Sequence, residues 1–144
     1  MPLPEPIPGL VVRYSYLWHD EGLSGQEEGA KNRPCALVLV SQKDDKTRVL
    51  VTPITHTKPD DLSLAVEIPI KTKKRLGLDD KPAWVICSEV NEFYWPGHDL
   101  MPISKKGLKR FYYGVLPPKL FNRIKLKVQF IAKGRQLKTV ERSE

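Results

Sequence analysis

The segment NRPCALVLV, residues 32–40, decides the fold prediction. Residues 35–40 are all apolar, and a short run rich in β-branched residues is typical of a buried strand. Arg33 stands at its start, where Pro34 fixes its own φ and restricts the preceding residue to extended backbone. The sequence therefore predicts a permanent positive charge at the mouth of a buried strand.

Similar segments occur on both sides of this run. They are rich in Val, Ile, Thr and aromatic residues and are separated by Gly, Pro and Asp. Short strands at this spacing favour a small antiparallel barrel or sandwich. The expected strands are residues 10–18, 34–42, 47–55, 63–70 and 83–93.

The segments between these strands have distinct characters. Residues 19–32 contain three glycines and are expected to form a long exposed loop. Residues 71–80 predict a short helical turn closed by Gly77 in a left-handed conformation. Pro53 indicates an edge, a bulge or the end of its strand, because proline cannot donate to a sheet ladder.

The pattern changes after residue 117. Apolar residues recur there at helical spacing, and Pro117-Pro118 stands where a helix start tolerates proline. Alternation over residues 124–130 offers a competing strand interpretation, but we favour the helix. The helical set is Leu120, Phe121, Ile124, Val128 and Ile131.

The chain is expected to form a single, mainly β domain over residues 1–144. Prolines at alternate positions predict an extended lead-in over residues 1–8, and residues 134–144 are expected to be a flexible tail. Hydrophobic residues make up 40% and charged residues 28%, which indicates a globular protein. No apolar run approaches the roughly 18 residues of a membrane span, and no secretory signal is recognisable. We expect a cytoplasmic protein with no membrane partner.

The chain offers no recognisable metal-binding motif. Cys35 and Cys87 both lie inside apolar runs, which predicts buried, reduced thiols. The three histidines are scattered, and no zinc-type ligand spacing occurs. We therefore expect neither a metal nor another cofactor.

Positive charge is concentrated at the C-terminal end. Residues 1–100 hold 12 Lys and Arg against 15 Asp and Glu, a net charge of −3. Residues 101–144 hold 12 against 2, a net charge of +10. This asymmetry indicates either a polyanionic partner, nucleic acid or an acidic protein segment, or a solvated basic tail.

Several fragments in a fixed order resemble the PemK/MazF family of bacterial toxins from type II toxin–antitoxin systems. A glycine-containing acidic loop precedes an Arg-Pro pair at a strand start, and a Pro-Ile-Thr ends the next strand. A Val-Glu-Ile strand, a Gly-Leu turn and a strand with an acidic residue follow. The matching positions are Gly25 to Gly29, Arg33-Pro34, Pro53-Ile54-Thr55, Val66-Glu67-Ile68, Gly77-Leu78 and Glu89.

The resemblance implies an SH3-like barrel of the CcdB–PemK type, with short helices, a C-terminal helix and a homodimeric assembly. It implies an endoribonuclease that cuts single-stranded RNA, chiefly mRNA, at short sequences without a metal. The 2′-hydroxyl attacks the adjacent phosphate in many family members. A cognate acidic antitoxin is the implied protein partner. Carried over by position, the catalytic residues are Arg33 and Thr55.

The chemistry of these two side chains fits such a role. A guanidinium offers parallel donors to phosphate oxygens and stays charged at physiological pH. The Thr55 hydroxyl is a second donor from the neighbouring strand end. The alternatives are an ion pair of Arg33 with Glu27, Glu28 or Glu89 and an ordinary strand role for Thr55.

Three residues are candidates for proton transfer, and the sequence does not select among them. His56 follows Thr55 and has a suitable side chain, although we expect it on the opposite face of a continuing strand. His19 begins the glycine-containing loop, and Glu28 lies within it.

Basic and aromatic residues predict the RNA-binding surface. Trp18 and the cluster Phe93-Tyr94-Trp95 are candidates for stacking on unpaired bases. Basic side chains could follow the RNA backbone or simply form a solvated face. The basic candidates are Lys31, Lys58, Lys71, Lys73, Lys74 and Arg75.

Some features depart from the family pattern. The acidic loop is one residue longer before Arg33, and His56 replaces a frequent Ser or Thr. The basic C-terminal end exceeds what cleavage needs and could hold the acidic tail of an antitoxin. Because a fold does not fix its chemistry, two alternatives stay open: a gyrase-inhibiting toxin, and a non-catalytic homologue that binds RNA or antitoxin.

Overall fold

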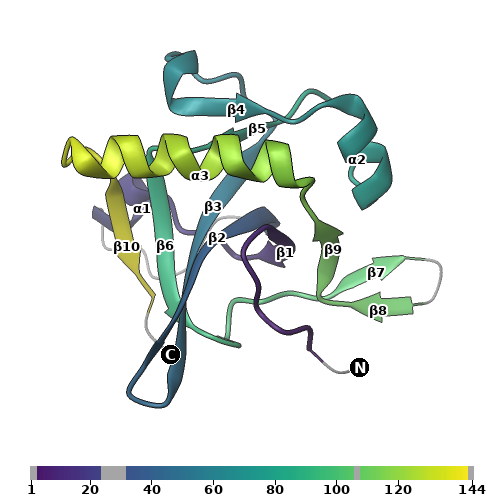
Figure 1. The fold of residues 1–144 in the computed structure, drawn as a ribbon. Helices are drawn as coiled ribbons and strands as arrows, with labels where there is room; N and C mark the ends of the chain where they lie inside the picture. The colour runs from purple at the N-terminus through teal and green to yellow at the C-terminus, as the bar shows by residue number, and fades with distance from the viewer. Residues whose placement is uncertain (1–2, 24–31, 106–107, 143–144) are drawn as a thin grey trace.

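The computed structural model describes residues 3–23, 32–105 and 108–142 (Figure 1). Its helices are α1 (His19–Leu23), α2 (Ile70–Leu76) and α3 (Pro118–Lys133), with a 3₁₀ turn at Leu62–Leu64. Its strands are β1 (Leu10–Tyr14), β2 (Arg33–Lys43), β3 (Lys46–Thr55), β4 (Ala65–Glu67), β5 (Trp84–Ile86), β6 (Glu89–Tyr94), β7 (Ile103–Lys105), β8 (Leu108–Arg110), β9 (Tyr112–Val115) and β10 (Lys138–Glu141).

One curled sheet forms the body of the molecule (Figure 1). Its strand order is β10-β6-β3-β2-β1-β9, and β5 joins β3 to β4. Along β3, Arg48–Val51 pair with β6, whereas Ile54–Thr55 pair with β5. Pro53 lies between the two pairings, where a missing N–H costs no ladder bond on that side. The sheet curls into a half-barrel, and the predicted mainly β, barrel-like fold is confirmed.

Both faces of the central sheet are buried, which explains the uninterrupted apolar run of β2. Ala36 and Val38 face one hydrophobic core, and Cys35 and Leu37 face the other. Residues alternate between the two faces of a strand, so a strand buried on both sides is apolar throughout. Cys35 is buried and free, as is Cys87, which confirms the prediction of reduced thiols.

The C-terminal helix covers the first core (Figure 1). Four residues of α3 at helical spacing are buried against the sheet: Leu120, Ile124, Val128 and Ile131. Pro118 occupies the first turn, where its missing N–H has no intrahelical partner to lose. The helix prediction is confirmed, and the competing strand interpretation is wrong. None of the helices in the described part of the chain has the length and apolar character needed to cross a bilayer.

Local signals located α2 well but missed other elements. Gly77 ends α2 with φ of 75°, the left-handed conformation that the sequence predicts. The expected strand over residues 83–93 is divided into β5 and β6. Residues 19–23 form α1 rather than loop, and β7, β8 and β9 were not expected.

The expectation of a flexible tail over residues 134–144 is corrected. Lys138–Glu141 form β10, which pairs in parallel with Glu89–Glu92 of β6. Arg142 is buried and donates to the Ser15 carbonyl oxygen at 2.7 Å and to Asn91 Oδ1 at 3.0 Å. These partners lie far away in the chain, so no local pattern could indicate that this end is anchored.

Candidate active site

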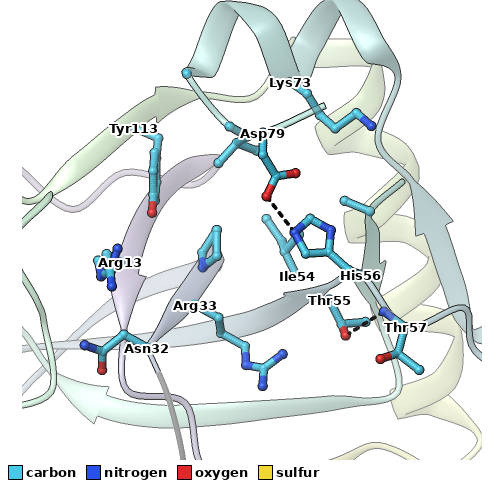
Figure 2. A pocket seen from close by; sticks show the side chains of 14 residues that line it. Arg13, Asn32, Arg33, Ile54, Thr55, His56, Thr57, Lys73, Asp79 and Tyr113 are labelled. Atoms are coloured by element: carbon cyan, nitrogen blue, oxygen red, sulfur yellow. Dashed lines mark hydrogen bonds and ion pairs between the residues drawn. The ribbon is translucent and has the colours of Figure 1, made fainter. Parts of the chain in front are cut away.

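A cavity of about 320 Å³ opens where β2 begins and β3 ends (Figure 2). Arg33, Thr55 and His56 line it, together with Arg13 and Tyr113 on the opposite side. A second hollow of about 360 Å³ adjoins it and includes Arg33, Thr55, Thr57 and Trp18. The structure thus brings Arg33 and Thr55 together between two spaces large enough for parts of a ligand.

Arg33 begins β2 opposite Tyr14 of β1. Its guanidinium carbon lies 4.9 Å from the centre of the Trp18 ring, a cation–π contact. Its Nε is buried without a hydrogen-bond partner within the described residues. A buried donor without an acceptor is costly, and an anion bound beside it would remove that cost.

Glu89 does not pair with Arg33. Its Oε1 accepts from the Tyr16 hydroxyl and the His19 backbone N–H, each at 3.0 Å. Burial raises the pKa of Glu89, and the two hydrogen bonds oppose that change. The proposed alternative of an Arg33–Glu89 ion pair is therefore wrong, whereas Glu27 and Glu28 lie outside the described residues.

Thr55 is the last residue of β3 and is buried. Its Oγ1 accepts from the Thr57 backbone N–H at 3.1 Å, which fixes the side-chain rotamer. The hydroxyl hydrogen can then be donated to a ligand. Thr55 is consequently a preorganised donor next to an arginine.

His56 lies on the same cavity as Thr55, contrary to the expectation that it would face the other way. The strand ends at Thr55, so alternation does not continue through His56. Its Nδ1 lies 2.8 Å from the Pro82 carbonyl oxygen. Its Nε2 lies 2.8 Å from Asp79 Oδ2 (Figure 2). Both partners are acceptors, so a ring nitrogen that carries hydrogen donates to one of them. His56 thus ties the end of β3 to the segment after α2.

The other two candidates for proton transfer are not placed in either space. His19 begins α1, lines neither the cavity nor the hollow, and has its Nδ1 3.9 Å from Asp20 Oδ1. Glu28 lies outside the described residues, as does the basic candidate Lys31.

Among the remaining basic candidates, some side chains are exposed and others donate hydrogen bonds to backbone carbonyl groups. Lys58 and Lys74 are exposed, and Lys58 lies between Thr57 and Pro59 of the hollow. Lys73 was expected either to contact the RNA backbone or to belong to a solvated face; the solvated alternative is wrong, because this residue is buried and its Nζ donates to the Lys81 carbonyl oxygen at 2.6 Å. Arg75 is exposed but donates to the Val115 carbonyl oxygen at 2.7 Å, away from Arg33.

Sequence reasoning missed Arg13, Tyr113 and Asp79 as cavity residues. One signal was available, because Arg13 interrupts the apolar run of β1. Burial raises the pKa of the Tyr113 phenol, and the positive charge of the neighbouring Arg13 opposes that change. Nothing local marks Tyr113 or Asp79, which reach the cavity only through the pairing of β9 with β1 and the position of α2.

Comparison with solved structures finds a similar fold. An endoribonuclease in complex with its cognate antitoxin from Mycobacterial species superposes with a TM-score of 0.51 at 14% identity. The match covers 89% of this chain and 95% of that chain. No protein-family model and no curated protein matches the sequence. At this level of identity the likeness concerns the fold.

Proposed function

We propose that the protein is a toxin-type endoribonuclease that cleaves single-stranded RNA, chiefly mRNA, without a metal ion. One observation carries the proposal. The Arg33 guanidinium has no acidic partner within the described residues, and Arg33 and Thr55 line the same cavity and the same hollow. The order of sequence motifs and the fold of the similar endoribonuclease support it.

The proposed reaction is an internal transesterification. The 2′-oxygen loses its proton and forms a bond to the adjacent phosphorus, while the bond to the 5′-oxygen breaks and that oxygen gains a proton. The products are a 2′,3′-cyclic phosphate and a 5′-hydroxyl. Negative charge accumulates on the non-bridging oxygens, where Arg33 supplies two parallel donors and Thr55 a third.

His56 takes a supporting role in this proposal. Both of its ring nitrogens already face acceptors, so it is not poised to remove the 2′-hydroxyl proton. Its ring lines the cavity and holds the segment of Asp79 and Pro82 in place. We therefore assign His56 to positioning rather than to proton abstraction.

Trp18 and two exposed lysines complete the proposed RNA-binding surface. Trp18 orients Arg33 and borders the hollow, where its aromatic edge can contact an unpaired base. Lys58 beside the hollow and Lys74 on α2 can contact the backbone of a bound strand.

The proposal includes two protein contacts. An acidic antitoxin is the expected partner because residues 101–144 carry a net charge of +10. The similar endoribonuclease was solved with its antitoxin, which supports this assignment. A homodimer follows from the resemblance of the sequence motifs to the toxin family.

The decisive experiment is incubation of the purified protein with a long single-stranded RNA in excess EDTA. We expect discrete fragments that end in a 2′,3′-cyclic phosphate, identified by end-specific ligation or mass spectrometry. RNA that stays intact with and without added divalent ions would refute the proposal. In that event a DNA-supercoiling assay would test the gyrase-inhibitor alternative.

A further inference from the structure

The proposed cleavage chemistry does not use the side of the cavity formed by Arg13 and Tyr113. Arg13 lies on β1 and Tyr113 on β9, which pair in the sheet. Figure 2 shows the Tyr113 phenol directed toward the Arg13 guanidinium. We call this pair the Arg13–Tyr113 wall.

Positively charged side chains outnumber negatively charged ones around this wall. Arg13, Arg33 and Lys73 line the cavity, together with the His56 ring. Asp79 also lines it, but its Oδ2 is occupied by His56. Arg13 forms no ion pair within the described residues. An excess of positive charge in a hollow attracts an anionic ligand.

The two arginines lie at separate points on the same cavity. Figure 2 shows the Arg33 guanidinium on the side of Thr55 and the Arg13 guanidinium on the side of Tyr113. A single strand of RNA carries one phosphate charge for each nucleotide. Two guanidiniums arranged in this way can bind two successive phosphates.

Tyr113 suits the same ligand. Its hydroxyl lies on the cavity near Arg13 and has no acceptor among the described residues, so its hydrogen can be donated to a phosphate or ribose oxygen. Because burial raises the pKa of this phenol, the hydroxyl keeps its hydrogen at physiological pH. The cavity volume of about 320 Å³ is comparable to that of small-molecule sites.

We propose that the Arg13–Tyr113 wall is a second anion subsite, which binds the phosphate next to the scissile one in a single-stranded RNA. The identity of the ligand rests on the proposed function. Arg33 and Thr55 would act on the scissile phosphate, and Arg13 would fix the strand beside it. A protein carboxylate is the competing ligand, which the experiment distinguishes.

The test measures binding to an RNA oligonucleotide whose cleavage-site 2′-hydroxyl is replaced by hydrogen. Arg13→Ala should weaken binding about tenfold and lower the slope of log affinity against log salt by about 0.7, the loss of one phosphate contact. Arg123→Ala removes an exposed arginine of α3 and should change affinity less than about twofold. Equal losses in the two variants would overturn the subsite.

A neutral methylphosphonate placed at each linkage in turn locates the contact. The effect of Arg13→Ala should disappear when the linkage next to the cleavage site is neutral, and should persist elsewhere. If Arg13→Ala does not fold, Arg13→Lys and Tyr113→Phe serve instead, and each should weaken binding by about threefold. Unchanged binding in both would overturn the subsite.

The failure of the subsite and the failure of the proposed function give different results. Cleavage by the wild type with no effect of Arg13 refutes the subsite alone. Binding that depends on Arg13 without any cleavage refutes the nuclease and leaves only an RNA phosphate site at the Arg13–Tyr113 wall. If Arg13→Ala weakens binding of an acidic peptide but not of RNA, the wall binds protein carboxylates and the proposal is wrong.

Discussion

The Arg33 guanidinium lies over the indole of Trp18, with 4.9 Å between the guanidinium carbon and the ring centre. Trp18 precedes α1, and its backbone N–H donates to Glu21 Oε1 at 3.0 Å. The contact covers the flat face of the guanidinium and leaves the N–H groups at its edge available to a ligand. An ion pair would instead occupy those donors.

Replacing Trp18 should therefore impair cleavage through Arg33. We expect Trp18→Ala to lower kcat/KM about tenfold, within the range of a lost cation–π contact, and Trp18→Phe to lower it less than about threefold. The loss should become smaller when Trp18→Ala is made in an Arg33→Ala background, because Trp18 then has no guanidinium to orient and only its contact with a base is removed. Additive losses would show that Trp18 acts independently of Arg33.

Arg33 and Thr55 should each be required for efficient RNA cleavage. Arg33→Ala and Thr55→Ala are expected to lower cleavage by at least about 100-fold, the scale of lost transition-state donors. Arg33→Lys keeps the charge but not the paired donors, and Thr55→Ser keeps the hydroxyl, so both should retain more activity. Thr139→Ala, at an exposed position on β10, is the control. Wild-type rates in both alanine variants would refute the site.

His56 and Asp79 should behave as one structural unit. Both side chains are half exposed, so their coupling in a double-mutant cycle of unfolding free energy should be about 0.5 kcal/mol. His56→Gln and Asp79→Asn should each lower cleavage by only about fivefold, whereas loss of a general base costs about 100-fold or more. A loss on that larger scale, with a changed pH profile, would assign the proton transfer to His56.

The sequence predicted those features that depend on residues close together in the chain. The apolar run of β2, the period of α3 and the turn at Gly77 are local signals, and all three located their elements. The placement of Arg33 beside Thr55 came from motif order, because strand ends meet only through pairing. Arg13 and Tyr113 meet through the β1–β9 pairing, which joins segments about a hundred residues apart, and short strands such as β9 give little local signal.

Glu89 gives a pH dependence that can be tested by stability. Burial raises its pKa above the ordinary 4.5, so the native state disfavours ionisation. Its contribution to stability is present below pH 4.5 and is lost as the pH rises through the higher native value. Glu89→Gln keeps the acceptor for Tyr16 and His19 and should be more stable relative to wild type at pH 7 than at pH 4.

Urea unfolding at the two pH values measures this difference. Glu67→Gln, at an exposed position on β4, gives the reference for the loss of one negative charge. A smaller stability advantage of Glu89→Gln at pH 7 than at pH 4 would contradict the assigned direction.

The C-terminal strand ends in a buried polar network. Arg142 forms an ion pair with Asp99 Oδ2 at 3.0 Å and donates to Asn91 Oδ1 at 3.0 Å. Asn91 in turn accepts from the Leu17 backbone N–H at 2.9 Å and donates to the Leu17 carbonyl oxygen at 2.7 Å. The network thus connects β10 to the residue that precedes Trp18.

Removing Arg142 should consequently destabilise the whole fold. Arg142→Ala leaves the Asp99 carboxylate and the Ser15 carbonyl oxygen without this partner, and breaking a buried pair costs about 3 kcal/mol or more. Urea titration should show a loss of that size in the free energy of unfolding. The control is Lys138→Ala, at an exposed position of the same strand, which should change this free energy by less than about 0.5 kcal/mol. If the two variants were equally stable, Arg142 would not anchor β10, and the pairing of β10 with β6 would have to hold this strand.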